Sequence, residues 1–532
     1  MNWKKVTCGN SVEEFVFEKT GKSIAQIIHM VPEYRIYRLN EVKNALFEAK
    51  LRNMLVTLVS DFDDDGIQST LIMTYIFAAI GLKYQLIIPK RFSEGYGLSM
   101  KIIERVPDGG LLVTIDNGIK AIEPIAEAKR KGMKVIIMDH HEAGAELPAA
   151  DIIVDPKAVG EADYTEYCGA GIAYKLAEEI FGKYHPIMKK LSCFAAIGTI
   201  GDSVEILEDN RKIVIDGLEN MKRGKGSEGL KMLLEAQRFS EGSSATDIAF
   251  NIVPVLNACG RLKDDGAKMG VVALIDGGQE KREKINELLD MNDLRKKLVE
   301  EAISRIDLSA MATSKDRSIF VVDNQISLGI VGIVAGKISE YTNKPAFVLA
   351  KDETTGFYKG SARSKNDDYS LAGLMEAHAE LFVGFGGHLK AAGLTMKEEN
   401  IMVFKDAIEK ELPDVVFDDA IPYDIEVLEA DFPTVAAQII SLEPFGEGNP
   451  APVIRMQMNI DYFSVIGKNK DTLKFTGFGY EAIMFHAGEK IEKIAALPEH
   501  ISVIDLIGKV GVNVFRDKRT TQINITDFVV LR

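Results

Sequence analysis

Between about residues 55 and 225, short apolar runs alternate with segments of helical character. The runs LVTLVS, KYQLIIP, LLVTID and KVIIMDH are hydrophobic almost throughout, and STLIMTYIFAAIG and EPIAEAKRKG stand between them. Strands that are apolar on both faces belong to parallel sheets that helices cover on both sides. The pattern therefore predicts a doubly wound α/β domain, which we place at residues 46–225 after an N-terminal segment at 1–45.

Three segments with other patterns follow this domain. Residues 226–307 predict a helical connector, because QEKREKINELLDMNDLRKKLVEEAISRID at 279–307 is charge-rich, free of Gly and Pro, and apolar at helical spacing, as a long solvated helix is. A smaller α/β pattern, with SIFVVDN, PAFVLAKD and VGFGGHLKAAG, predicts a second domain at 308–415. From 416 to 532, short strands separated by turn residues predict a small β-barrel of the OB type.

Composition narrows the class of protein. The 532 residues, 46% hydrophobic and 27% charged, suffice for several globular domains. No apolar run reaches the roughly 18 residues of a membrane span, and the opening MNWKKVTCGNSVEEF carries acids where a signal peptide is apolar. We therefore expect a cytoplasmic protein that does not contact membranes. The four cysteines show no CxxC spacing, so we expect reduced thiols and no structural zinc site.

The net charge of −15 argues against diffuse binding of nucleic acid, because Lys and Arg neutralise phosphates. Any contact with nucleic acid must then be a local basic groove.

The motif DFDDDG at 61–66 follows the strand LVTLVS. Ligands of open parallel sheets gather at the carboxyl ends of strands, and adjacent carboxylates repel one another unless a cation neutralises them. The alternatives are an exposed acidic loop or the opening of an EF-hand. An EF-hand has flanking helices and a Glu at loop position 12, whereas here a strand precedes and Ile72 occupies that position.

Two further strands end in the same way, at Asp116 in TIDNG and at Asp139-His140-His141 in IMDHH, and Asp202 follows the small, apolar run CFAAIGTIG. A lone acid after a strand usually caps a turn, but recurrence at several strand ends of one sheet indicates a shared site. Oxygen ligands with one or two imidazoles suit Mn²⁺ or Mg²⁺ better than zinc or iron. Two such ions bridged by a carboxylate are the usual machinery for attack on phosphorus.

The motifs DFDDDG, TIDNG, DHH and GTIGD, in this order, resemble those of the DHH phosphoesterase superfamily. Further stretches resemble its RecJ branch: RFSEGYG at 91–97, CGAGIAYKL at 168–176, LNACGRL at 256–262, GIVGIVAGKI at 329–338, GSARS at 360–364, FGGHLKAAG at 385–393 and LEPFGEGNP at 442–450. FGGH resembles the signature of a DHHA1 domain, and LEPFGEGNP resembles the start of a RecJ OB domain. The resemblance covers about residues 45–532 and implies the order DHH domain, long helix, DHHA1 domain and OB domain.

Carried over residue by residue, the resemblance implies two bound divalent ions, Mn²⁺ or Mg²⁺, with Asp116 as the bridge. The implied metal ligands are Asp61, Asp63, Asp65, Asp116, His140 and Asp202. His141 would face the scissile phosphate, and Asp139 would orient the imidazoles. Arg261 and His388 resemble residues that hold the scissile region. Arg91, Ser361 and Arg363 resemble a pocket for a terminal 5′ phosphate, which guanidinium groups contact with paired hydrogen bonds.

Two departures from the family pattern stand out. Asp64 replaces a small or apolar residue inside the first motif, so we expect extra negative charge near the metals. Ile326-Ser327-Leu328 replaces an aromatic residue and a His before GIVGIVAGK. Neither change removes an implied ligand.

The resemblance implies a monomeric exonuclease that degrades single-stranded DNA from 5′ to 3′, releases 5′-mononucleotides and acts in DNA recombination and repair. A helicase and a single-strand DNA-binding protein are the implied partners. In the OB domain we expect a groove for the strand, with plain solubilising charge as the alternative reading of its basic residues. These residues are Lys468, Lys470, Lys474, Arg516, Lys518 and Arg519.

Other functions fit the same metal core. A nanoRNase, a cyclic-dinucleotide phosphodiesterase or a pyrophosphatase would have little use for an OB domain. A non-catalytic replication scaffold would have lost metal ligands, and all six are present.

Overall fold

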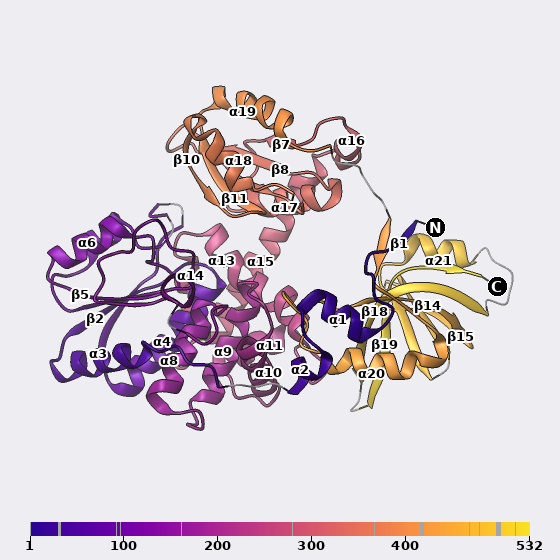
Figure 1. Cartoon of the computed structure of the whole chain (residues 1–532), viewed down its shortest axis with the longest axis horizontal. Helices are drawn as coiled ribbons and strands as arrows, with labels where there is room; N and C mark the ends of the chain where they lie inside the picture. Colours follow the sequence, from indigo (N-terminus) through magenta and orange to yellow (C-terminus); the bar gives the residue numbers. More distant parts are fainter. Residues whose placement is uncertain are drawn as a thin grey trace. The chain divides into compact units, whose positions relative to one another are not determined.

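The computed structural model describes residues 2–531 except 30–32, 92, 96, 161, 279, 367, 415–419, 468, 478, 496–501 and 516–517, and leaves the side chains of 489, 493, 495, 515 and 518 undescribed (Figure 1). It comprises two compact units. The first combines Met1–Leu288 with Ala420–Arg532, and the second is Leu289–Asp419. None of the helices in the described ranges is both long and apolar enough to cross a membrane.

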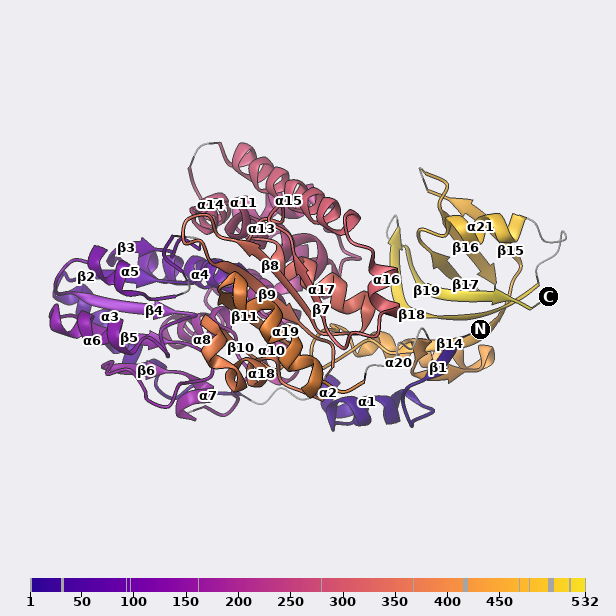
Figure 2. The same cartoon turned by 90° about the horizontal axis from the view of Figure 1, so that it is seen from above.

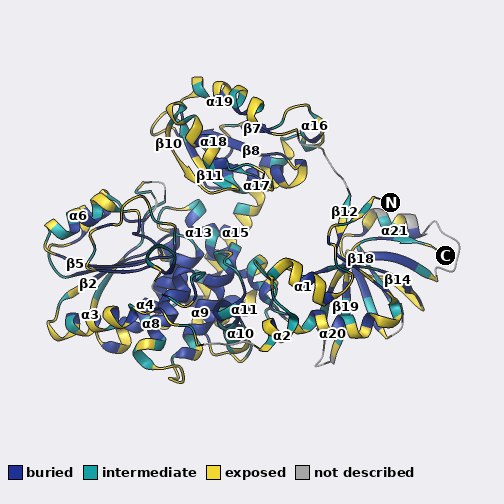
Figure 3. Ribbon diagram, in the orientation of Figure 1, coloured by how far each residue is buried: buried dark blue, intermediate teal, exposed yellow. Residues whose placement is uncertain are grey.

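The first unit contains the expected parallel sheet, with the strand order β3-β2-β4-β5-β6. Its strands are β2 (Leu55–Val59), β3 (Lys83–Ile87), β4 (Leu111–Ile115), β5 (Lys134–Met138) and β6 (Ile152–Val154). The inner strands are buried because helices cover both faces (Figure 3). One face packs against α5 (Met100–Arg105) and α6 (Ile122–Arg130), and the other contacts α3 (Leu39–Leu51), α4 (Asp64–Ile80) and α8 (Gly169–Phe181).

The strand order contains a topological switch at β2. The chain leaves β2 through α4 to β3 on one side, then crosses back to β4 on the other side of β2. In open α/β sheets, ligands bind at the carboxyl ends of the strands that flank such a switch. The fold therefore directs attention to the residues that follow β2 and β4.

A helical region extends this domain. The short α7 (Pro156–Val159) precedes α8, and α9 (Met188–Gly201) packs against both α4 and α8. The following elements are α10 (Glu208–Lys222), α11 (Glu228–Ala236), α12 (Ala245–Asp247), the π-helical η1 (Ile248–Ile252), α13 (Val253–Leu262) and α14 (Gly266–Leu274). Both α13 and α14 contact α4. The long helix expected at 279–307 is α15 (Lys281–Ser304).

The second unit is built on a mixed sheet with the order β10-β11-β9-β8-β7, in which β7 and β8 are parallel and the other pairs are antiparallel. Its elements are α16 (Leu308–Thr313), β7 (Ile319–Val322), α17 (Val331–Thr342), β8 (Ala346–Lys351), β9 (Tyr358–Arg363), α18 (Leu371–Ala377), η2 (Ala379–Leu381), β10 (Phe382–Gly387), β11 (Ala391–Met396) and α19 (Glu398–Glu411). One core lies under α17 and another under α18 and α19.

The C-terminal strands form a mainly antiparallel sheet of the order β13-β14-β18-β19-β17-β16-β15. The elements of this C-terminal region are, in chain order, β12 (Ile421–Tyr423), β13 (Ile425–Val427), η3 (Glu429–Asp431), α20 (Phe432–Ser441), β14 (Val453–Asn459), β15 (Tyr462–Ile466), β16 (Thr472–Gly477), β17 (Tyr480–Met484), α21 (Gly488–Ala495), β18 (Val503–Phe515) and β19 (Lys518–Val530).

The N-terminal segment packs with the C-terminal region, an arrangement that no pattern along the chain predicts. Strand β1 (Trp3–Lys5) pairs in parallel with β12 (Figure 2). Phe15 of α1 (Val12–Thr20) and Ile27 of α2 (Ile24–His29) belong to the same buried core as Phe432 of α20. Leu207, at the end of the segment that precedes α10, also belongs to this core.

Candidate metal centre

The first acidic motif makes a tight turn from β2 into α4. Asp63 caps the helix and accepts a hydrogen bond from Gly66 N at 3.1 Å. Gly66 lacks a side chain, and a Cβ there would stand 2.4 Å from the carbonyl oxygen of Asp61. Ser60 Oγ donates to Gly66 O at 2.8 Å and ties the turn together. The motif therefore presents its acids at the carboxyl end of β2.

Asp65 faces the N-terminus of α8. Gly169 N and Ala170 N donate to its two carboxylate oxygens at 2.6 and 2.9 Å. A Cβ on Gly169 would lie 2.6 Å from Asp116 Cβ and 3.0 Å from Asp65 Oδ2, so only glycine permits this approach. Sequence reasoning missed this clamp. The glycine-rich CGAG before a helical pattern was the available signal, because such glycines often mark close approaches of the backbone.

Asp116 follows β4 in the left-handed conformation, with φ of 61°. A non-glycine residue there costs roughly 1–3 kcal/mol, and such strain tends to occur at functional sites. Asp116 N donates to Met138 O at 3.0 Å, which holds Asp116 between the ends of β4 and β5. The Asn117 amide donates to Val59 O and Ile115 O and links the ends of β2 and β4.

Asp139 holds the two histidines. Its Oδ1 accepts from His140 N at 2.8 Å and lies 2.8 Å from His141 Nδ1, and its Oδ2 accepts from Ile119 N at 3.0 Å. Burial raises the pKa of Asp139, but the hydrogen bond from His141 and the charges of both histidines outweigh it, and the net shift is downward. Burial lowers the pKa of His141, whereas Asp139 and the more distant carboxylates raise it on balance.

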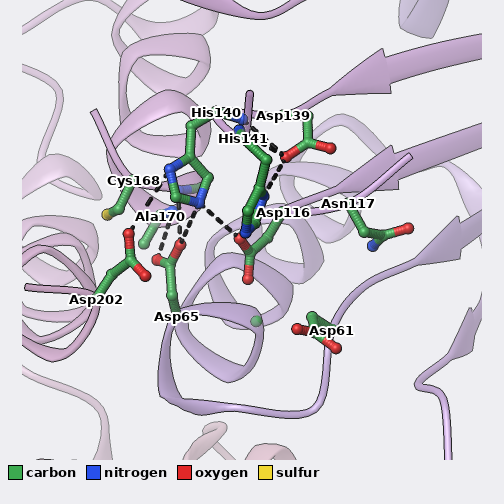
Figure 4. A network of polar contacts seen from close by, with 12 residues as sticks. Asp61, Asp65, Asp116, Asn117, Asp139, His140, His141, Cys168, Ala170 and Asp202 are labelled. Atoms are coloured by element: carbon green, nitrogen blue, oxygen red, sulfur yellow. Dashed lines mark hydrogen bonds and ion pairs between the residues drawn. The ribbon is translucent and has the colours of Figure 1, made fainter. Parts of the chain in front are cut away.

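His140 stands at the centre of the cluster (Figure 4). Its Nε2 lies 3.0 Å from Asp116 Oδ1 and 3.9 Å from Asp65 Oδ2, and its Nδ1 lies 3.6 Å from Asp202 Oδ2. Burial and the neighbouring His141 lower its pKa to about 4, so the ring is neutral near pH 7. A neutral imidazole is the form that ligates metals.

Groups of side chains that could hold a metal ion, with ligand atoms within 4.8 Å of one another, occur here in the described part of the chain. One group is Asp61, Asp63 and Asp116; another is Asp65, His140 and Asp202; a third is Asp116, Asp139, His140 and His141. The six ligands expected from the sequence all fall within the first two groups. The contact between Asp116 and His140 joins them.

The electrostatics of this cluster favour a bound cation. Burial, followed by repulsion from neighbouring carboxylates, raises the pKa values of Asp61, Asp116 and Asp202 well above the usual range. Among the described residues, Asp61 Oδ1 and His140 Nδ1 are buried and have no hydrogen-bond partner. Buried polar atoms normally have partners, and divalent cations are the partners that oxygen-rich sites with an imidazole accept. The residues therefore fit divalent ions.

Family models match most of the chain. The model of the DHH family, N-terminal domain, matches residues 55–199, the DHHA1 domain matches 316–414, and the RecJ OB domain matches 423–527. Over 481 residues the chain is 30% identical to the single-stranded-DNA-specific exonuclease RecJ of Thermus thermophilus, and the match covers 88% of this chain and 68% of that protein. The chain belongs to the RecJ family.

A relative of the same name from Bacillus subtilis is 31% identical over 511 residues, which cover 92% of this chain and 63% of that protein. The crystal structure of RecJ in complex with Mn²⁺ from Thermus thermophilus matches with a TM-score of 0.78 at 26% identity, covering 98% of this chain and 76% of that one. These matches confirm the expected fold class of a DHH domain, a DHHA1 domain and an OB domain.

In this RecJ-family chain, Asp64 belongs to none of the ligand groups found among the described residues, but its charge helps to raise the pKa of Asp202, as expected of an extra carboxylate near the site. Its buried carboxylate accepts from Gln68 Nε2 at 2.9 Å, and a Cβ on Gly201 would stand 2.1 Å from its Oδ2. Asp64 N donates to Asn257 Oδ1 at 3.0 Å. Asp64 therefore packs between α4, α9 and α13, and among the described groups it is not a metal ligand.

Two of the arginines that resemble RecJ substrate contacts lie near the first motif. The Arg91 guanidinium stands 5.0 Å from the centre of the Phe62 ring. Burial lowers the Arg91 pKa, and the charges of Asp61 and Asp63 oppose that shift. Arg261 follows Gly260, where a Cβ would be 2.6 Å from Phe62 O. This close approach brings α13 against the motif.

Ser361 and Arg363 form a polar cluster within the second unit. Arg363 Nη1 donates to Ser361 Oγ and to Ala362 O, both at 2.8 Å. A Cβ on Gly332 would lie 3.1 Å from both Arg363 Nη2 and Ser361 Oγ, so the start of α17 adjoins the pair. A guanidinium, a hydroxyl and a helix N-terminus are a combination that binds phosphate. His388, exposed in the turn between β10 and β11, donates through its backbone N to Ala391 O.

The basic residues expected in the OB groove are only partly described. Lys470 is exposed in the turn between β15 and β16, and Arg519 is exposed on β19. Lys474 forms an ion pair with Glu481 at 2.5 Å, which favours a local role. Lys468, Arg516 and the side chain of Lys518 lie outside the described residues.

Proposed function

We propose that this chain is a metal-dependent exonuclease that hydrolyses single-stranded DNA. The relatives at 30% and 31% identity are named single-stranded-DNA-specific exonuclease RecJ. The observation that carries the proposal is the pair of carboxylate-rich ligand groups joined at Asp116 and His140. This arrangement stands at the switch point of the sheet, where open α/β sheets bind their ligands.

The proposed metal content is two divalent ions, Mn²⁺ or Mg²⁺. Asp61, Asp63 and Asp116 would hold one, and Asp65, Asp116, His140 and Asp202 would hold the other. Ions bound there would supply Lewis acidity for the attack of water on phosphorus. Asp65 is held in place by two backbone N–H groups of α8, so its oxygens have little freedom to turn away.

His141 is the proposed contact to the scissile phosphate. Asp139 binds its Nδ1 and thereby fixes the ring, and we propose that Nε2 of the ring so held donates a hydrogen bond to a phosphate oxygen. Asp139 is thus a positioning residue. Arg261 and His388, each from a RecJ-like motif, are proposed to hold the scissile region of the strand.

We propose that a 5′-phosphate pocket sets the direction in which the strand is degraded. The Ser361–Arg363 pair beside the start of α17 offers donors for a terminal phosphate. Arg91, from another RecJ-like motif, is proposed as a further contact to phosphate. An enzyme that anchors the 5′ end would release 5′-mononucleotides in the 5′ to 3′ direction. Lys470, Lys468, Arg516 and Lys518 are proposed to guide the remaining strand along the OB domain.

The cellular setting proposed with this activity is DNA recombination and repair in the cytoplasm. We propose that the enzyme acts as a monomer and that a helicase and a single-strand DNA-binding protein present its substrate. A nanoRNase or cyclic-dinucleotide phosphodiesterase is disfavoured by the RecJ OB match at 423–527, because a dinucleotide is too short to use such a domain. A non-catalytic scaffold is disfavoured by the gathered ligand groups.

Digestion of end-labelled strands tests the proposal. A single-stranded DNA with a 5′ phosphate should yield labelled mononucleotide at once from a 5′ label, and only late from a 3′ label. The reaction should require Mn²⁺ or Mg²⁺ and stop in EDTA. Matched duplex DNA, single-stranded RNA and a linear dinucleotide serve as competing substrates. Faster hydrolysis of the dinucleotide than of the long strand would favour the small-substrate alternative.

A further inference from the structure

Arg211, in the first turn of α10, is buried, and the described hydrogen bonds of its side chain all go to the backbone of the OB segment. Its Nη1 donates to Leu442 O at 2.8 Å and Pro444 O at 3.4 Å, and its Nη2 donates to Glu443 O at 2.6 Å and Ser441 O at 3.4 Å. Its exposed fraction is 7%. These carbonyls lie at the carboxyl end of α20, where a helix has unpaired acceptors and partial negative charge. Arg211 therefore caps α20 from another domain.

The loop after α20 returns over the segment that precedes α10. Ile206 N donates to Glu447 O at 2.7 Å. A Cβ on Gly446 would stand 2.4 Å from Ile206 Cδ1, and one on Gly448 would stand 2.7 Å from Glu205 Cβ. Asn449 Nδ2 donates to Leu442 O and Pro444 O, both at 2.9 Å, and shares two acceptors with Arg211. The motif LEPFGEGNP is thus shaped to lie against residues 205–207.

The segment so covered carries a proposed metal ligand at its start. Asp202 caps the end of α9, and residues 203–207 lead directly from it to α10. Ser203 and Glu208 both adopt the left-handed conformation, with φ of 58° and 49°. Two strained residues in so short a connection persist only when their surroundings hold them.

The OB loop does not fill all the space beside this segment, because residues 445–447, 450 and 451 of the loop line a cavity together with it. Ser203, Val204 and Ile206 border this cavity of about 350 Å³, which Phe250, Phe445 and Lys509 also line. The segment therefore has room to move if its contacts with the OB loop are lost. The side chain of Asp202 is 24% exposed, more than those of Asp65 and His140 in the same ligand group.

We propose that Arg211 is a positioning residue for the metal centre. By holding the carboxyl end of α20 and the following loop against residues 205–207, it keeps Asp202 beside His140. The integrity of one ligand group thus depends on the OB domain being docked. The inference rests on the proposed function of Asp202 as a metal ligand, and it adds a residue that touches neither metal nor DNA.

Mn²⁺ binding by the full-length protein tests this directly. Arg211→Ala should weaken the affinity of one of the two Mn²⁺ sites by about 10- to 100-fold, the range usual for residues that orient metal ligands. The Mn²⁺ affinity of Arg211→Lys should lie between those of wild type and Arg211→Ala, because one ammonium group cannot make all the contacts of a guanidinium. Titration calorimetry measures the affinity, and circular dichroism confirms the fold.

Arg455→Ala is the matched control. Arg455 pairs with Asp505 at 2.8 Å inside the OB domain and does not reach residues 203–207. Its loss should lower stability while leaving Mn²⁺ affinity unchanged. Hydrolysis of a five-nucleotide strand by Arg211→Ala should be slow at low Mn²⁺ and recover as Mn²⁺ is raised.

Wild-type Mn²⁺ affinity in a folded Arg211→Ala protein would overturn the proposal, as would a slow rate that excess Mn²⁺ leaves unchanged. If Arg211→Ala does not fold, the Mn²⁺ titration of Arg211→Lys replaces it. A wild-type Mn²⁺ affinity in Arg211→Lys would equally overturn the proposal. A wild-type protein that binds Mn²⁺ but leaves DNA intact would contradict the proposed function alone. The comparison of Mn²⁺ affinities between wild type and the Arg211 variants would still test the role of Arg211.

Discussion

Asp116 Oδ1 lies 3.0 Å from His140 Nε2, and this contact connects the two candidate ligand groups. The residues come from the ends of neighbouring parallel strands, β4 and β5. Asp116 reaches this position in a strained left-handed conformation. A parallel sheet with a switch point thus brings both groups to one edge, and the backbone at Asp116 turns a carboxylate between them.

The first prediction concerns this carboxylate. Asp116→Ala should lower kcat at least about a thousandfold, equivalent to roughly 4 kcal/mol in the barrier, because both ligand groups lose an oxygen. Single-turnover digestion at saturating Mn²⁺ measures the loss, and circular dichroism checks the fold. A rate above about a tenth of wild type would contradict the role of Asp116 as a shared ligand.

The second prediction concerns Asp139, which binds His141 Nδ1. Asp139→Asn should lower kcat by about 10- to 100-fold, because an amide at this position can no longer fix the ring through a charged acceptor. The KM for DNA should change little. Asp151→Asn is a control, since Asp151 pairs with Lys129 at 2.6 Å away from the ligand groups. Equal kcat losses in both variants would argue against a special role for Asp139.

The third prediction compares two glycines of α8. Gly169→Ala should displace Asp116 and Asp65, because its Cβ would stand 2.6 Å from Asp116 Cβ, and metal binding should weaken at least about tenfold. A Cβ on Gly171 would be 3.3 Å from the Tyr167 ring, a closeness that a shift of a few tenths of an ångström relieves. Calorimetric titration with Mn²⁺ should therefore separate the two variants. Indistinguishable affinities would show that α8 tolerates the added methyl.

The fourth prediction concerns the proposed 5′-phosphate pocket. Arg363→Ala should slow hydrolysis of 5′-phosphorylated strands much more than of 5′-hydroxyl strands, because the lost guanidinium would bind only the former. Lys359→Ala is the control on the same strand, where Lys359 pairs with Asp352 at 2.8 Å. Initial rates on the two substrates give the comparison. If the two rates fall by the same factor, Arg363 acts elsewhere.

The sequence predicted the parts of the site that depend on single elements. Continuous apolar runs predict parallel strands, and acids at their carboxyl ends must then share one edge, which is how Asp61, Asp116 and His140 could be grouped in advance. The same pattern singled out Asp202 as an acid after a small, apolar run, and the structure shows that this run is a helix, α9.

Contacts between distant segments could not be predicted in this way. Asp65 binds Gly169 N across 104 positions of sequence, and Phe15 shares a core with Phe432. Periodicity identifies which face of an element is buried, but the partner depends on how whole domains pack. The orientation of Asp64 was missed for the same reason, because it depends on how closely Gly201 of α9 approaches. The predicted domain boundaries stay predictions.

The core that the N-terminal helices share with the C-terminal strands complicates a truncation meant to test the OB domain. Removing residues from 420 onward would expose Phe15 and Leu207 and take away the acceptors of the Arg211 side chain. Such a truncation would report on folding as well as on DNA binding. Charge reversal at Lys470 is cleaner, because this exposed residue stands in a turn.

The most direct test of the central claim is the anomalous scattering of Mn²⁺ in crystals of the wild-type protein. The account predicts two peaks, roughly 3.5–4 Å apart as in other two-metal sites. One should contact Asp61 and Asp63, the other Asp65, His140 and Asp202, and Asp116 should contact both. A single peak at saturating Mn²⁺, or two peaks of which only one contacts Asp116, would contradict it.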